Sequence, residues 1–436
     1  MTLYKFIIVS LIFLGFSQAK AQDIITLEAA VKVALENNYE IKIASNNALI
    51  NTTNVTVGNA GMLPTVAATV AANNRVQNSS QTLQNGTTNS LDNAKNNSLN
   101  YGVNLDWTVF DGFKMFAKLD QLKELQKLGE AQLKQTILTK ISAVTSTYFD
   151  LVQQQQQLKA LDSTIVISNQ RLALAQNRFA IGKASKLEVL NAQVDLNTDK
   201  VALLRQKDLY ANTKILFNQI LARDTKTEFK VIDTIKVDAD LTLNELTALA
   251  EKQNPQLEAQ IIALKVAELQ LKQVKANRYP SLKLSTGYNL SSTQASLGFA
   301  TATSAKGFNY GFSAALNIFD GLAQNRNEKI AHIQIDNSKL IVEEQKLALQ
   351  SQLATSFQTY TTNLELISLE EKNEAIAKQN LAITLDKFKI GTITTLEFRT
   401  AQLNYVNAKV RNSNAQFQAK LSEIALKELA GTINLN

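Results

Sequence analysis

The sequence predicts a mainly α protein that also contributes strands to a transmembrane β-barrel. Two observations indicate long helices: the 436 residues include only 15 Gly and 3 Pro, and the stretch from Leu322 to Ile390 contains neither. Most turns and helix ends use Gly or Pro, so few turns can interrupt the helices. A third observation, segments in which apolar and polar residues alternate, indicates strands with one apolar and one polar face.

The composition disfavours an enzyme. The chain has no Cys and one His, which excludes thiol catalysis, disulfides and Cys/His zinc sites. No pair of Asp or Glu residues has a spacing that marks a catalytic site. The formal net charge is +7, but the Lys and Arg residues are dispersed, so the sequence carries no nucleic-acid footprint. We expect no cofactor and no metal, and we interpret the single His332 as a polar residue on a helix face.

The first 21 residues are predicted to be a cleaved signal peptide. Lys5 precedes an apolar stretch at 6–16, and Ala19 and Ala21 fit the small-x-small cleavage rule. An apolar stretch this short does not span about 30 Å of hydrocarbon. After it, no apolar run reaches the length of a transmembrane helix. An exported chain of this kind is expected to be either soluble or a β-barrel.

The chain contains an internal duplication. Pro64 and Pro280 are separated by 216 positions, and the Phe-Asp-Gly sequences at 110–112 and 319–321 are separated by 209. Several other pairs share these two offsets, so the first copy contains 7 additional residues before Tyr101. We therefore predict two structural repeats, 22–224 and 241–436, joined by an extended connector at 225–240.

Each repeat is expected to contain four elements in the same order. In the first repeat a helix is followed by a β-hairpin at about 64–111, a long helix at about 113–181 and a return helix at about 185–222. In the second repeat the corresponding hairpin is at about 281–319, the long helix at about 322–390 and the return helix at about 394–430.

The alternating segments fit tilted strands that cross a membrane. Val103, Leu105, Trp107 and Val109 are expected to face lipid, and Asn104, Asp106 and Thr108 to face a polar lumen. Between the strands of the first hairpin, 16 of the 23 residues from Val76 to Ser98 are Asn, Ser, Thr or Gln, which predicts a long outer loop. The alternative is a pair of amphipathic hairpins on a soluble core, but the rest of the chain provides no sheet for them to join.

The long helices carry a coiled-coil pattern of apolar residues. In the first, Val144, Tyr148, Leu151 and Leu158 follow four- and three-residue steps, and Leu353, Phe357, Tyr360, Leu364 and Ile367 occupy matching positions in the second. A single helix buries only one stripe of its surface, so these helices must pack against neighbours. An extended fibrous coiled coil would explain the helices but not the strands.

Both helical hairpins have the same turn chemistry. Gly182 and Gly391 are expected to be left-handed C-caps that let the chain reverse. Ser185 with Glu188, and Thr394 with Glu397, fit a capping box at the start of each return helix. These turns, with Leu187 and Leu396 beside them, and the duplicated order of elements over 22–436 resemble the TolC-like outer membrane efflux protein (outer membrane factor) family.

The resemblance implies a homotrimer that forms an exit duct. Each chain would give four strands to a 12-stranded barrel in outer membrane lipid of a Gram-negative bacterium, and its coiled-coil helical hairpins to a periplasmic α-barrel. The turns at Gly182, Ser185, Leu187, Glu188, Gly391, Thr394, Leu396 and Glu397 would contact a periplasmic adaptor (membrane fusion) protein. That adaptor connects to an inner-membrane pump in tripartite efflux or type I secretion. The resemblance also suggests an aperture near Glu397, although the next expected acidic position is Thr400, beside Arg399.

A second function class is a coiled-coil structural or adhesive surface protein without a pore. It predicts no barrel and no channel activity. The sequence does not identify a transported substrate, so drugs, metal ions, lipids and polypeptides all stay open.

Overall fold

The computed structural model describes residues 23–232 and 234–433, so the predicted signal peptide with Ala19 and Ala21 lies outside the described residues. The chain divides into two compact units. One comprises the described residues up to Ser45 together with Gln132–Glu258 and Gln345 onward, and the other comprises Asn46–Ala131 and Ala259–Glu344. Each unit therefore combines segments from both halves of the sequence.

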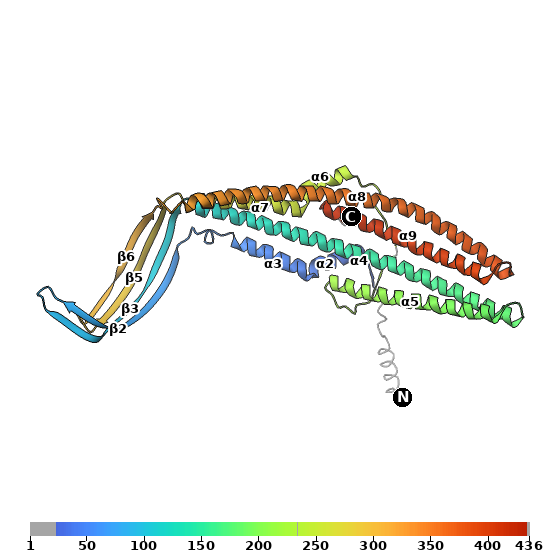
Figure 1. Cartoon of the computed structure of the whole chain (residues 1–436), viewed down its shortest axis with the longest axis horizontal. Helices are drawn as coiled ribbons and strands as arrows, with labels where there is room; N and C mark the ends of the chain where they lie inside the picture. Colours follow the sequence, from blue (N-terminus) through green and yellow to red (C-terminus); the bar gives the residue numbers. More distant parts are fainter. Residues whose placement is uncertain (1–22, 233, 434–436) are drawn as a thin grey trace, which may run out of the picture. The chain divides into compact units, whose positions relative to one another are not determined.

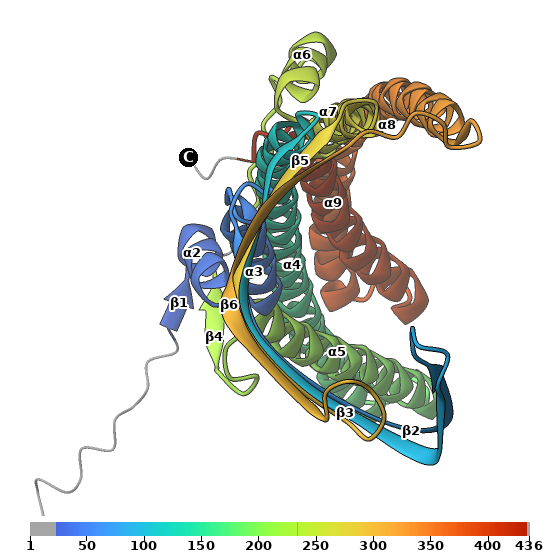
Figure 2. The same cartoon turned by 90° about the vertical axis from the view of Figure 1, so that its left-hand side faces the viewer.

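Four strands form one antiparallel sheet in the second unit, in the order β2–β3–β5–β6 (Figure 1). Their bounds are Thr65–Thr82 for β2, Thr88–Asp111 for β3, Ser281–Ala295 for β5 and Ala302–Ala315 for β6. β3 and β5 pair directly, so the two hairpins lie side by side in one sheet. Figure 2 shows that the strands follow one common curve. Within the described residues, the outer edges of β2 and β6 have no strand partner.

The two faces of this sheet differ in chemistry. Direct partners across a ladder share a face, so the pairs Trp107–Leu284, Val103–Tyr288 and Tyr288–Phe308 place apolar side chains on one side. The opposite side carries mainly polar and glycine positions, among them Asn104, Asn289 and Asn309. The predicted alternation is therefore present over all four strands.

The segment predicted as a loop, residues 76–98, is mostly strand, so that prediction was wrong. β2 continues to Thr82 and β3 begins at Thr88, which leaves a turn of five residues closed by the Leu83 N–H donating to the Thr87 carbonyl at 2.8 Å. Asn, Ser, Thr and Gln side chains need no buried face, and the ladder satisfies the backbone groups wherever the two strands run together. Polar composition concealed two strands whose side chains in this segment are mostly exposed.

The second hairpin ends earlier than expected. β6 stops at Ala315, opposite Ser281, although the predicted hairpin extended to about residue 319. β5 begins directly after Pro280, whose nitrogen carries no hydrogen to donate. Residues 316–319 therefore find no partner on β5, whereas the matching end of β3 is paired with β5 as far as Asp111.

Two helices of 67 and 68 residues, α4 (Lys114–Ala180) and α8 (Ala323–Ile390), pass through both units. At 1.5 Å per residue each is about 100 Å long. Gly112 and Gly321 precede them in the left-handed region, with φ of 72° and 65°. No helix within the described residues is both long and apolar enough to cross a membrane.

Two further helices pack against the long ones in the second unit. These are α3 (Tyr39–Asn54) and α7 (Pro255–Ala276), of which the parts after Ser45 and Glu258 belong to this unit. Leu271 of α7 packs with Ala331 and Ile335 of α8. A Cβ at Gly129, the only glycine in α4, would overlap the Asn51 side chain of α3, so close packing explains that glycine.

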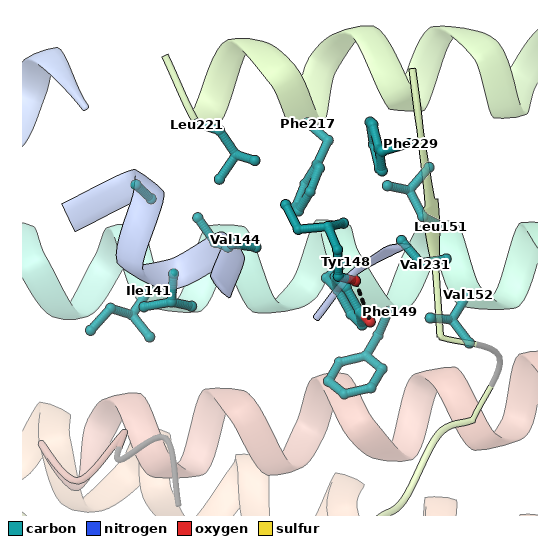
Figure 3. Close-up of a cluster of buried hydrophobic side chains, with 14 of the residues drawn as sticks. Ile141, Val144, Tyr148, Phe149, Leu151, Val152, Phe217, Leu221, Phe229 and Val231 are labelled. Atoms are coloured by element: carbon teal, nitrogen blue, oxygen red, sulfur yellow. Dashed lines mark hydrogen bonds between the residues drawn. The ribbon is translucent and has the colours of Figure 1, made fainter. Parts of the chain in front are cut away.

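The first unit has a core around Tyr148 (Figure 3). Phe217 packs beside its ring and Phe229 packs against Phe217. The pair of short parallel strands β1 (Asp23–Ile25) and β4 (Phe229–Val231) closes the cluster. The Tyr148 hydroxyl donates to the Ile25 carbonyl and accepts from the Ile232 N–H, both at 3.2 Å. Burial raises the pKa of the Tyr148 hydroxyl above its ordinary value. The predicted a/d positions Val144, Tyr148 and Leu151 are therefore core residues.

The remaining helices of the first unit are α2 (Leu27–Asn37), α5 (Lys186–Ile220), α6 (Leu243–Gln253) and α9 (Thr395–Leu429). α4 with α5, and α8 with α9, form two helical hairpins (Figure 1).

Candidate functional site: the two helical turns

Both hairpin turns reverse the chain through one glycine. Gly182 and Gly391 have φ of 73° and 81°, as expected for left-handed C-caps. At the first turn the Lys183 N–H donates to the Arg178 carbonyl at 2.8 Å, and at the second the Thr392 N–H donates to the Lys387 carbonyl at 3.0 Å. These bonds define a Schellman motif at each turn. A Cβ at either glycine would meet no other atom within 4 Å, so the turns are open to their surroundings.

The two return helices are capped differently. At the second turn Thr394 and Glu397 form the complete capping box, with the Thr394 N–H donating to Glu397 Oε2 at 2.8 Å and the Glu397 N–H donating to Thr394 Oγ1 at 3.2 Å. At the first turn Ser185 accepts from the Glu188 N–H at 3.3 Å, but the reciprocal bond is not formed. The prediction of a capping box in both copies is therefore wrong for the first copy.

Glu188 makes an ion pair instead. Its carboxylate lies 3.3 Å from Arg178 Nη1, and the Arg178 guanidinium also lies over the Phe388 ring at 5.8 Å from the centroid. Phe388 in turn stacks on Phe398 with a centroid separation of 5.0 Å. The carboxylate that was expected to cap the first return helix thus helps to connect one turn to the other.

A groove of about 600 Å³ lies between the two turns. Its lining includes Ser185, Leu187, Glu188, Gly391, Thr394 and Glu397. Leu187 beside the first turn is 64% exposed, and Leu396 beside the second is 73% exposed. Six of the eight predicted turn residues therefore line one groove, while Gly182 and Leu396 are not among its lining residues.

The three residues proposed for an aperture do not form one group. Glu397 and Thr400 are exposed, and Thr400 Oγ1 donates back to the Leu396 carbonyl. Arg399 is buried, and its guanidinium donates to both Asp199 carboxylate oxygens at 2.8 and 2.7 Å. Arg399 therefore does not share the exposed surface of Glu397 and Thr400.

The Arg399–Asp199 pair belongs to a buried polar cluster that sequence reasoning missed. Ser168 Oγ donates to Asp199 Oδ2 at 2.6 Å, Gln402 Nε2 donates to Ser168 Oγ at 2.8 Å, and Arg171 pairs with Asp195. The cluster joins α4, α5 and α9. Charged residues in a helix normally indicate a solvated face, and no spacing within one helix shows that three helices bring their charges together.

The described residues contain no group of three or more His, Asp or Glu side chains placed to hold a metal ion. His332 is exposed on α8, as expected for a polar residue on a helix face.

The sequence matches the outer membrane efflux protein family over residues 30–223 and 246–432. The chain is 24% identical over 343 residues to the outer membrane protein TolC of Vibrio cholerae, covering 76% of each protein. Among solved structures, it resembles the CmeC outer membrane channel of Campylobacter jejuni, with a TM-score of 0.78, 18% identity and coverage of 93% and 85%. It also resembles the outer-membrane channel OprN, with a TM-score of 0.76, 17% identity and coverage of 93% and 90%.

The fold and the paired turns thus define a TolC-like channel protein, in which four strands and two long helical hairpins come from one chain. The chain belongs to the outer membrane efflux protein family. It is an outer membrane efflux channel of the kind that serves tripartite efflux and type I secretion in Gram-negative bacteria, and it is not an enzyme. Channels of this family function as trimers.

Proposed function

We propose that three copies of this chain form one exit duct, with a 12-stranded barrel in the outer membrane and a tunnel of helical hairpins in the periplasm. The observation that carries the proposal is the four-stranded sheet, which has two free edges and two chemically different faces. Four strands cannot close a barrel, and eight would leave an interior filled by side chains. Twelve strands form the smallest closed assembly of this sheet that leaves room for a water-filled lumen.

The division into structural repeats, 22–224 and 241–436 with a connector at 225–240, is part of this proposal. Support comes from Asn38 and Asn254, which are 216 positions apart. Asn38 Nδ2 donates to the Ile220 carbonyl and Asn254 Nδ2 to the Leu429 carbonyl, both at 2.9 Å. Ile220 and Leu429 are themselves separated by 209 positions, so one contact recurs with both offsets of the duplication.

We further propose that the groove between the turns receives a periplasmic adaptor protein, which connects the duct to an inner-membrane pump. The groove combines the exposed Leu187 side chain with the carboxylates of Glu188 and Glu397. A glycine at each turn lets another helical hairpin approach the backbone closely. Glu397 and Thr400 remain proposed aperture groups, since both are exposed on α9.

Replacing Gly391 by Trp should abolish export and adaptor crosslinking while trimers remain in the outer membrane. The bulky ring would fill the space above the turn, whereas the barrel and the helical core are untouched. Crosslinking would be measured from Thr394→Cys, which is the only thiol in the chain because the protein has no Cys.

Gly391→Ala is the matched control for this experiment. It imposes the same left-handed strain, about 1–2 kcal/mol, without the bulk. We expect the Ala variant to export at close to the normal rate. Normal export and crosslinking by the Trp variant would refute the docking site, and equal loss in both variants would mean that turn geometry alone is required.

A further inference from the structure

The internal duplication extends to a short motif within the sheet. Asn100-Tyr101-Gly102 of β3 recurs as Asn309-Tyr310-Gly311 of β6, at the offset of 209. In the same way Asn289 of β5 corresponds, at the offset of 216, to Asn73 of β2. β3 and β5 are neighbours in the sheet, whereas β6 and β2 are its two free edges.

Gly102 and Asn289 show what the motif does between the paired strands. They are direct partners across the β3–β5 ladder. A Cβ at Gly102 would overlap Asn289 Oδ1, so the glycine leaves room for the asparagine side chain. Asn289 Nδ2 then donates to Asn104 Oδ1 at 3.0 Å. At this point of the ladder an asparagine side chain therefore lies over a glycine.

Gly311 is the repeat counterpart of Gly102, but no asparagine side chain lies over it in the single chain. The nearest atom to a Cβ there would be Ser285 Oγ at 3.9 Å, on the β5 side. On the other side β6 has no neighbour among the described strands. Asn73, the repeat counterpart of Asn289, is exposed on the opposite edge. Gly311 and Asn73, the counterparts of two residues that are in contact, therefore lie on the two opposite edge strands of the sheet.

We propose that β2 of a second copy pairs antiparallel with β6, with Asn73 of the partner subunit directly opposite Gly311. This register rests on the trimeric barrel proposed above, and it specifies how neighbouring copies join. Ser313 is the repeat counterpart of Asn104 at the offset of 209. The amide of Asn73 of the partner subunit would therefore donate to Ser313 Oγ, as Asn289 donates to Asn104. The same register places Ser313 opposite Ala71 of the partner subunit on the polar face and Phe312 opposite Ala72 of the partner subunit on the apolar face.

The register also accounts for the early end of β6. Residues 316–319 correspond to 107–110 of β3, of which Trp107, Thr108 and Phe110 are paired with β5. In the proposed register they lie beside the first residues of β2 of the partner subunit, so their backbone groups acquire hydrogen-bond partners. This pairing would extend β6 to the length first expected from its sequence.

Cysteine pairs test the register. Ser313→Cys combined with Ala71→Cys should yield a covalent trimer under mild oxidation, because opposed Cα atoms in an antiparallel ladder are about 4.5–5.5 Å apart. Ser313→Cys with Ala67→Cys is the matched control, since the second cysteine would be displaced by four residues, about 13 Å along the strand. The chain contains no other Cys.

Each outcome decides between the two proposals. Linkage at Ala71 alone supports the register. Linkage at Ala67, or no linkage in a protein that is still a trimer, overturns the register and leaves the barrel proposal standing. A protein that is monomeric in outer membranes, even without substitutions, would overturn both.

A glycine substitution gives an independent measurement. Gly311→Val should greatly reduce trimer yield, because the new side chain would occupy the place of Asn73 of the partner subunit. Gly307→Val should be mild, since the repeat counterpart of Gly307 is Ser98, which already carries a side chain. Equal trimer yields for the two variants would overturn the proposed contact.

Discussion

At the scale of single residues, the cluster around Arg399 shows how burial changes the role of a charge. Asp199 is 6% exposed and Arg399 is 8% exposed, and Asp199 takes its charged partner from Arg399, which also lies 3.8 Å from Asp195. A fully hydrogen-bonded buried pair contributes little compared with an apolar pair of the same volume, but removing one partner leaves an uncompensated charge. The pair therefore matters for how α5 and α9 are held together within the first unit.

Arg399→Met should destabilise the first unit by about 3–5 kcal/mol, because Asp199 would remain buried without its partner. The double variant Arg399→Met with Asp199→Leu should recover most of that loss. Thermal unfolding of the helices, followed by circular dichroism in detergent, would measure both effects.

Thr400→Ala is the control, since this neighbouring side chain is exposed and bonds only within its own helix. We expect its melting temperature to stay close to that of the unsubstituted protein. A double variant no more stable than Arg399→Met would contradict the assignment of the loss to an unpaired Asp199.

At the scale of elements, local sequence determined the ends of helices better than the ends of strands. The glycine turns and Thr394 cap lie where their residue types predict, because these interactions occur within a few residues. Strand ends depend on a partner. β3 is long because β2 and β5 pair with it, and β6 is short because β5 begins at Ser281. No pattern within a strand contains that information.

Neighbouring residues of β5 test the two faces of the sheet. Leu284 lies between Trp107 and Phe312 on the apolar face, and Ser285 lies between Asp106 and Gly311 on the polar face. Leu284→Lys should cost about 2–4 kcal/mol if that face meets the middle of the bilayer, and Ser285→Lys should be mild. The measurement is the yield of assembled trimer in outer membranes. Similar yields for both variants would exclude a lipid-facing apolar side.

At the scale of the whole molecule, the duplication gives each compact unit two copies of similar elements. The β-hairpins of both copies share one sheet, and the turns of both helical hairpins line one groove. The sheet of such a chain has two free edges, and the proposed assembly pairs them with the edges of other copies of the same chain. The first hairpin is also longer than the second, since β2 and β3 continue past the last residues that pair with β5.

The turn at residues 83–87 is expected to face the outside of the cell. An epitope inserted after Asn85 should be detected by antibody on intact cells, and assembly should be unaffected because the turn is exposed. The same epitope inserted at Lys183, in the first helical turn, should be detected only after the outer membrane is permeabilised. The reverse pattern would show that the proposed topology is inverted.

The sequence by itself determined the kinds of element and their order. Two long helical stretches with few breakers, alternating segments that begin after Pro64 and Pro280, and turns at Gly182 and Gly391 follow from local conformational preferences that need no tertiary partner. The tertiary structure alone decided where the polar strands of the first hairpin end, that Glu188 pairs with Arg178, and that Arg399 is buried against Asp199. These features depend on residues that are distant in sequence, and only packing brings such residues within reach of one another.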